Sequence, residues 1–409
     1  MTHSAVAMIT ALVTLLAMTA SLPASAEPLS LARAREMVLE NHGGLKALKE
    51  ERAAAEEALR QASAYVNPEI EVETKDLGRS EVEVVLTQPV LTGGKRGASV
   101  GVARWDAEIA ELRLQSARVS IEAELIRRFV PVLSAHRRLD LADSMIEVSA
   151  GNIQAVRRLV EAGASMEIDA VRAELERDEL MLERAKLERS LAEAEVKLSE
   201  LWGDAEFRFD GVQGSLPAGL ALPALEELGA AMEGHPEVQI LDTQRLLVKA
   251  EMDYAKAEGA PELAFSAGYL HEHETDEQSL IAGASISLPI FNRNKAAVAA
   301  KRHEMAAAQH EAGQVRLERS TDLATMCSQF EVSGTELNTL SGEVLAKAAR
   351  IHRTLEDFYV QGKTGILDVL AARGHLLELQ MRIVDLTEQR ALLAADLQEL
   401  TGYRIEVIQ

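Results

Sequence analysis

Apolar residues at helical spacing fill long parts of this chain. Near the C-terminus they recur every three or four positions, with Arg390 as the one break: Leu376, Leu379, Ile383, Leu386, Leu393, Leu397 and Leu400. An earlier segment has the same spacing: Leu180, Leu187, Leu191, Ala194, Leu198 and Leu201. The pattern is typical of helices that pack along a coiled-coil seam. Two longer helices are predicted upstream of the seams, over 95–162 and 295–361, and each would reach about 100 Å. Pro131 lies inside the first of them and is expected to kink it or to open a bulge.

Four shorter segments alternate polar and apolar residues, which predicts β-strands. The first two are Glu69–Thr74 and Glu81–Val84. In the later pair the apolar residues fall on one face: Leu263, Phe265, Ala267 and Tyr269, then Leu280, Ala282, Ala284, Ile286 and Leu288. The fold class expected from these patterns is mainly α with a small β part.

The order of the segments is repeated with an offset of about 200 residues, a period too long for a solenoid. Asn41-His42-Gly43 corresponds to Gly234-His235-Pro236, and Gln88-Pro89-Val90-Leu91 to Leu288-Pro289-Ile290-Phe291. Two copies of one unit are therefore expected, each with a first helix (about 28–66 and about 223–259), a β-hairpin, a long helix and a return helix. The predicted boundaries are 27–203 for the first copy (hairpin 68–90, long helix 95–162, return helix 165–202), 204–222 for a linker, and 223–409 for the second copy (hairpin 262–290, long helix 295–361, return helix 364–401).

The N-terminus has the features of an export signal. Residues 5–18 are apolar except for Thr10 and Thr14, and Ala24-Ser25-Ala26 matches a cleavage site, so 1–26 is predicted to be a signal peptide. No later stretch is apolar for the roughly 20 residues that a membrane helix needs. Cys327 is the single cysteine and cannot form an internal disulfide. Its place in a helical stretch favours the role of a small buried hydrophobe.

The backbone groups of an open strand edge cannot stay without hydrogen-bond partners in lipid, so the four predicted strands need further strands beside them if they cross a membrane. Three chains would supply twelve strands and close a β-barrel, with a long α-helical coiled-coil barrel below it. Ile70, Val72, Val82 and Val84 would then meet lipid. The alternating acidic residues would line the lumen: Glu69, Glu71, Glu73, Glu81 and Glu83. A soluble antiparallel sheet with one solvated face shows the same alternation and remains an alternative.

At this point the chain resembles the TolC family of outer-membrane efflux channels over its whole mature length. Residues 88–96, Gln-Pro-Val-Leu-Thr-Gly-Gly-Lys-Arg, are similar to a strand exit of the CzcC-like branch, and 288–295 are similar to that branch's second exit. The resemblance implies an outer-membrane channel that extends into the periplasm. It also implies a homotrimer that works with a periplasmic adaptor and an inner-membrane RND-type pump to expel heavy-metal cations.

The resemblance also implies functional residues at the two helix-turn-helix tips, which would dock the adaptor in the periplasm. They are Gly163, Ser165, Asp169, Gly362, Thr364, Gly365 and Asp368. Three copies of Asp368 would narrow the entrance and attract cations. Ala371 stands where some channels have a second acidic residue, so a double acidic ring is not expected. Alternatively, Asp169 and Asp368 only stabilise the N-termini of the return helices.

Other chemistry finds little support in the sequence. The net charge of −22 excludes nucleic-acid binding through a basic face. No motif of an enzyme or cofactor site is present. His271 and His273 have the residue types of a metal site, although polar loops often contain such residues by composition. His303 and His310 fit a solvated helix face better than a metal site, because further ligands are not evident.

Passive conduction by an outer-membrane efflux channel is the favoured function, with divalent heavy-metal cations as the substrate. Organic compounds or drugs are an alternative substrate class. A periplasmic coiled-coil adaptor or scaffold is an alternative of another kind, since it also contains long helical hairpins. An adaptor would carry one such hairpin between compact β-domains, whereas this chain has two short β-hairpins between helices.

Overall fold

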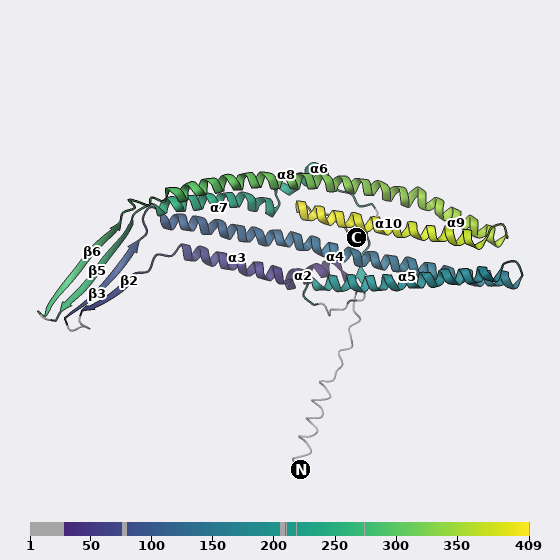
Figure 1. The fold of residues 1–409 in the computed structure, drawn as a ribbon, viewed down its shortest axis with the longest axis horizontal. Coiled ribbons are helices and arrows are strands. Elements are labelled where there is room, and N and C mark those ends of the chain that lie inside the picture. Colours follow the sequence, from purple (N-terminus) through teal and green to yellow (C-terminus); the bar gives the residue numbers. More distant parts are fainter. Residues whose placement is uncertain are drawn as a thin grey trace, which may run out of the picture.

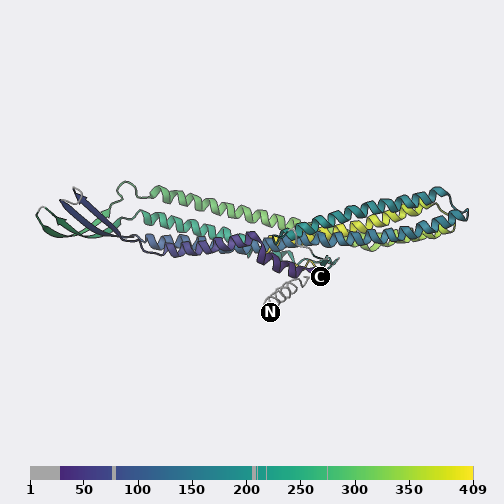
Figure 2. The same ribbon diagram turned by 90° about the horizontal axis from the view of Figure 1, so that it is seen from below.

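The computed structural model describes residues 28–75, 80–204, 209, 211–217, 219–273 and 275–408. The predicted signal peptide lies outside the described residues. Figure 1 shows an elongated molecule with a β-sheet at one end, two helix-turn-helix tips at the other, and helices running along the length between them. Figure 2 shows the same arrangement after a quarter turn. The described residues begin and end near the middle of the molecule, away from both ends.

The two copies have the same order of elements. The first contains α2 (Leu31–Asn41), α3 (Gly43–Ala62), β2 (Glu69–Lys75), β3 (Glu81–Val90), α4 (Lys95–Glu161) and α5 (Glu167–Glu200). The second contains α6 (Leu225–Glu233), α7 (Pro236–Glu258), β5 (Glu262–Glu272), β6 (Glu277–Ser287), α8 (Lys295–Thr339), a π-helical turn (Leu340–Val344), α9 (Leu345–Val360) and α10 (Ile366–Thr401). Two short strands, β1 (Leu29–Ser30) and β4 (Val212–Gln213), pair in parallel beside the middle of the molecule.

Helix α4 is the axis of the fold. Its 67 residues extend for about 100 Å. It packs between α3 and α7 on the side of the sheet and against α5 and α10 on the side of the tips. Phe129, Val130 and Val132 on α4 are fully buried at the centre. Two apolar clusters meet there, one with α6, α8, α10 and the C-terminal segment and the other with α2 and the end of α5.

The sheet has the strand order β2-β3-β5-β6, and all neighbouring strands are antiparallel. Its pairing register puts Val72, Val84, Tyr269 and Leu280 in one row on one face. Glu71, Val85, Gly268 and Ile281 form a row on the opposite face. Strand β2 has seven residues, whereas β3 has ten and β5 and β6 have eleven each. Within the described chain, β2 and β6 are the two edges of the sheet.

The first helix of each copy differs from the prediction, because each consists of two helices. The break in the first copy is at His42, whose ψ of 118° is not helical and whose Nδ1 accepts a hydrogen bond from the Leu45 amide at 3.3 Å. The break in the second copy is at His235, whose Nδ1 accepts from the Glu237 amide at 3.2 Å. A histidine side chain therefore caps a new helix at the same point of both copies.

The long helices also differ from the prediction. Helix α4 continues through Pro131 without the expected bulge, and Phe129, Val130 and Val132 beside the proline are fully buried. The irregular turn lies in the second copy instead, where Leu340–Val344 are π-helical between α8 and α9. No proline lies in that turn, and the residues there carry no other local signal of a π-helical turn.

Candidate channel entrance and pore-lining face

The two tips have the same backbone turn. Gly163 and Gly362 have φ angles of 72° and 69°, in the left-handed region that glycine adopts without strain. The amide three residues after each helix end donates to a carbonyl five residues upstream, from Ala164 to Leu159 and from Lys363 to Phe358, both at 2.8 Å. These bonds satisfy carbonyl groups that the helix ends leave free. The repeated glycines therefore mark two matching reversals of the chain.

Asp169 stabilises the first tip from inside. Only 9% of the residue is exposed. Its carboxylate accepts hydrogen bonds from the Ser165 hydroxyl at 2.7 Å and from the Met166 amide at 3.3 Å, and Arg172 lies 3.4 Å away. The carboxylate satisfies a free amide at the start of α5. Its negative charge also interacts favourably with the positive N-terminal end of the helix dipole. This environment is that of a structural cap.

Asp368 has a different environment at the second tip. It is exposed, and its carboxylate accepts a hydrogen bond from the Thr364 hydroxyl. The amide of Asp368 donates to the carbonyl of Gly365, which is the residue before α10. The sequence places Asp169 and Asp368 at equivalent positions, but only Asp368 presents a largely free carboxylate to the outside.

The two tips are joined by a small apolar cluster and a buried ion pair. Val156 and Ala170 of the first tip pack against Ile366 and Val369 of the second. One turn further along α10, Arg373 is only 2% exposed and donates to the Glu176 carboxylate at 3.1 Å. Sequence reasoning missed this pair, although Arg373 continues the three-to-four spacing of the α10 seam one step upstream. The pair links α5 of one copy to α10 of the other.

Stability at this end of the molecule is expected to fall below neutral pH because of His352. Burial lowers the pKa of His352 from 6.5, Glu356 opposes this effect, and the charge of Arg373 adds to it. The folded state therefore binds a proton less readily than the unfolded state. As the pH falls through the ordinary histidine range, protonation favours unfolding, by at most about 1.4 kcal/mol per pH unit for one group.

This dependence can be measured as the melting temperature of parent and His352→Gln protein between about pH 7.5 and pH 5. The parent should lose more stability than the variant over that range. Equal slopes for the two proteins would contradict the assignment. His235 is a second histidine whose pKa burial lowers, and it provides the background slope that remains in the variant.

The acidic residues predicted to line the lumen share one face of the sheet. Glu69, Glu71 and Glu73 alternate along β2, and Glu73 lies opposite Glu83 of β3. Glu81 lies opposite Lys75 and forms an ion pair with it. The apolar residues predicted to meet lipid share the other face, which continues across β5 and β6. The sheet thus has one polar, acidic face and one apolar face.

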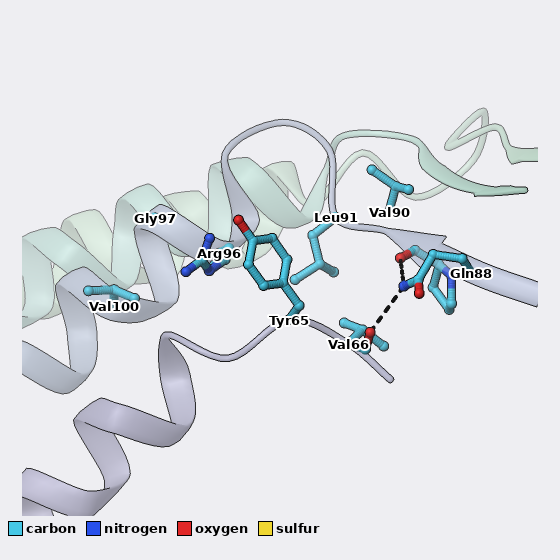
Figure 3. A pocket seen from close by; sticks show the side chains of 9 residues that line it. Tyr65, Val66, Gln88, Val90, Leu91, Arg96, Gly97 and Val100 are labelled. Atoms are coloured by element: carbon cyan, nitrogen blue, oxygen red, sulfur yellow. Dashed lines mark hydrogen bonds between the residues drawn. The ribbon is translucent and has the colours of Figure 1, made fainter. Parts of the chain in front are cut away.

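A cleft of about 600 Å³ lies where the first β-hairpin meets the helices. Figure 3 shows Tyr65 and Val66, before β2, facing Leu91 and Arg96 after β3. The guanidinium of Arg96 lies 4.1 Å from the centre of the Tyr65 ring and donates to the Ser63 carbonyl at 2.7 Å. The Gln88 amide donates to the Val66 carbonyl at 3.0 Å. These contacts fix the direction in which the strands leave the helices, and Arg96 is the one charged residue among the described residues that line the cleft.

The candidate metal residues are not gathered into a metal site. His271 lies opposite Val82 on the apolar face, and its ring centre is 4.5 Å from that of His273. His303 and His310 are both exposed on α8. Among the described residues, no group of three or more histidine, cysteine or acidic side chains is arranged to hold a metal ion. Cys327 is half-buried beside the central cluster, and burial raises the pKa of its thiol, which disfavours the reactive thiolate.

The two copies match one family of proteins. A family model described as outer membrane efflux protein matches residues 34–204 and again 228–403. The chain belongs to this family. It is therefore an outer-membrane efflux channel with a periplasmic extension, and the family match rules out the alternative of a periplasmic adaptor or scaffold. None of the described helices combines the length and apolarity required to cross a membrane.

Relatives and solved structures agree with this assignment. The chain is 29% identical to the cobalt-zinc-cadmium resistance protein CzcC of Cupriavidus metallidurans over 92% of this chain and 91% of that protein. It is 28% identical to the nickel-cobalt-cadmium resistance protein NccC of Alcaligenes xylosoxydans xylosoxydans over 68% and 64%. Its fold is similar to that of the CusC channel, with a TM-score of 0.79, 15% identity and coverage of 94% and 95%. The open outer-membrane channel MtrE of Neisseria gonorrhoeae gives a TM-score of 0.75, with 18% identity and coverage of 92% and 89%.

Proposed function

We propose that the protein is the outer-membrane channel of a tripartite efflux system, in which it conducts divalent heavy-metal cations passively to the outside. The channel would be a homotrimer, and its tips would receive a periplasmic adaptor that works with an inner-membrane RND-type pump. The observation that carries the trimer is the sheet, whose four strands have an acidic face, an apolar face and two open edges. Twelve such strands close a barrel with a wet interior.

The proposal of metal cations as the substrate is supported by two observations. The relatives that match along most of this chain are named as resistance proteins for cobalt, zinc, cadmium and nickel. The chain also has an excess of acidic residues, with a net charge of −22, and presents acidic groups along the proposed lumen and at the entrance. A passage lined by carboxylates concentrates cations and repels anions. In this proposal the protein needs no cofactor and catalyses no reaction.

The entrance is tested by Asp368→Ala in planar lipid bilayers. Three exposed Asp368 carboxylates around the threefold axis would attract cations, so the variant is expected to lose selectivity for cations and to be blocked less by divalent ions. Asp169→Ala is the matched control at the equivalent position of the first copy. Because Asp169 is a buried cap, its loss is expected to cost about 1 kcal/mol of stability without changing selectivity. Unchanged selectivity and block in Asp368→Ala would remove the proposed role of this residue.

A further inference from the structure

The strands at the two open edges of the sheet are the counterparts, by the internal repeat, of two strands that pair with each other inside the chain. By the internal repeat, β6 is the counterpart of β3, and β2 is the counterpart of β5. Strands β3 and β5 pair with each other where the two copies meet inside one chain. If three chains close a barrel, β6 of one chain meets β2 of the next. The junction inside the chain is therefore a template for the junction between chains, and the inference below rests on the proposed function.

The junction inside the chain has a defined register and an ion pair. Val90 lies opposite Leu263, and Gln88 lies opposite Phe265. Just beyond the paired residues, the Lys95 ammonium lies 2.8 Å from the Glu262 carboxylate, and only 9% of the Lys95 side chain is exposed. Lys95 is the first residue of α4, and Glu262 is the first residue of β5. The ion pair thus joins the start of a long helix to the start of the neighbouring strand.

The chain repeats this pair of residues at its open edges. Lys295 is the first residue of α8, as Lys95 is of α4, and Glu69 is the first residue of β2. The residue before each long helix, Gly94 or Asn294, has the same left-handed conformation, so both helices begin with the same geometry. Lys295 and Glu69 are both exposed in the single chain. Neither has a salt bridge to another described residue.

We infer that Lys295 forms an ion pair with Glu69 of the partner subunit at each of the three junctions of the ring. The register of the internal junction, carried over by the repeat, places Ile290 opposite Ile70 of the partner subunit and Leu288 opposite Val72 of the partner subunit. All four residues belong to the apolar face, so the pairing keeps each face of the sheet continuous. Antiparallel pairing is also preserved, because strand directions alternate along β2-β3-β5-β6.

The residues at the open edges fit a surface that awaits a partner. Leu288 and Ile290 are 60% and 62% exposed, and Ile70 is 71% exposed. Strand β6 ends at Ser287, whereas its counterpart β3 continues to Val90, which is equivalent to Ile290. Strand β3 has neighbours on both sides, and β6 has one. Pairing with a partner is therefore expected to extend β6 through Leu288–Ile290.

The exit loops of the two copies are not identical. A Cβ added at Gly93 would lie 2.2 Å from that of Ala260, so the first loop passes very close to the neighbouring copy. The equivalent residues are Arg293 and Asn67, which are too large for such an approach. The loop after β6 must therefore stand further from its neighbour, while the aligned helix starts still bring Lys295 to the same level as Lys95. The inference assigns Glu69 to subunit assembly and removes it from the free acidic groups of the lumen.

Charge reversal tests the ion pair. Lys295→Glu and Glu69→Lys are each expected to lower the equilibrium constant for trimer formation in mild detergent about tenfold or more, because three ion pairs are lost in each ring. The double variant is expected to recover most of the loss, because it restores the pairs with reversed sign. Glu71→Lys is the matched control, on the same face of the same strand but away from Lys295. The trimer fraction is measured by size-exclusion chromatography as a function of temperature.

Cross-linking tests the register. In a Cys327→Ser background, Leu288→Cys with Val72→Cys should give covalent trimers and dimers after mild oxidation. A bond within one chain is excluded, because β2 and β6 are three strand spacings apart, about 14 Å. Leu280→Cys with Val72→Cys, on the same face but off register, should not cross-link. If trimers form but the double reversal gives no recovery and Leu288 does not cross-link to Val72, the inference is wrong while the proposed function stands. A parent protein that forms no trimer in membranes would overturn the proposed function itself.

Discussion

Replacing Glu176 by alanine is expected to destabilise the half of the molecule that carries the tips by about 3 to 5 kcal/mol, because it leaves the buried Arg373 charge without an opposite charge beside it. Arg373 is 2% exposed, and the Glu176 carboxylate 3.1 Å away carries the opposite charge. Burial raises the pKa of Glu176 while Arg373 opposes the rise, so the pair forms against a cost of desolvation. Thermal unfolding followed by circular dichroism measures the loss.

A double variant separates the pair from its packing. Glu176→Leu with Arg373→Met removes both charges and keeps apolar volume, so it is expected to be close to the parent in stability. Arg157→Ala is a suitable comparison. The side chain of Arg157 is exposed, so its ion pair with Glu174 is worth at most about 1 kcal/mol. A Glu176→Ala protein as stable as the parent would show that water reaches Arg373. Loss of the pair is also expected to loosen the contact between the tips, on which the shape of the entrance depends.

The second large effect is expected at Arg390, where alanine should cost about 2 to 5 kcal/mol. Arg390 is 6% exposed and donates at 2.7 Å to two carbonyls, those of Phe330 and Leu220. Its guanidinium also lies 4.0 Å from the centre of the Phe330 ring. Removal of the side chain leaves two acceptors without these bonds and opens a void beside α8. Denaturant unfolding of parent and variant measures the difference.

Two further variants test the geometry at Arg390. Arg390→Lys keeps the charge but cannot reach both carbonyls with a planar fork, so an intermediate loss is expected. Gly334→Ala keeps Arg390 but places a Cβ 2.2 Å from its Nη1, which should displace the guanidinium and destabilise by about 1 to 3 kcal/mol. Gly313→Ala is the matched control on the same helix, where an added Cβ meets nothing within 4 Å. Stability equal to the parent in both Arg390 variants would contradict the anchoring role.

Periodicity and the repeat predicted the fold class, and the resemblance to known channels predicted the family. The α10 seam was visible because leucines recur at helical spacing, and Arg390 was visible as its one break. The two faces of β2 and β3 followed from strict alternation, since one pairing register satisfies both strands. The tip turns followed from Gly163 and Gly362, which both adopt the left-handed conformation expected after a helix.

The remaining features depend on contacts between distant segments. His42 and His235 could be aligned as equivalent residues, but a histidine that caps a helix has no pattern of its own in sequence. The Ser165 hydroxyl donates to Asp169 as the Thr364 hydroxyl donates to Asp368, so the two aspartates differ in the contacts that only Asp169 makes, with the Met166 amide and with Arg172. Pro131 suggested an irregularity, but α4 runs as one helix from Lys95 to Glu161. The role of Arg390 became visible only with Leu220, which lies 170 residues away in the chain.

The π-helical turn at Leu340–Val344 gives the second tip a lever arm. Helix α9 extends from that turn to the tip over 16 residues, which is about 24 Å. A bend of about 10° at the turn would therefore move the end of α9 sideways by about 4 Å. Asp368, which follows α9 across the second tip, would travel with it, whereas Asp169 follows the uninterrupted α4 across the first tip. In a ring of three chains the same small change of angle would occur in each chain, so the three movements together would alter the width of the passage.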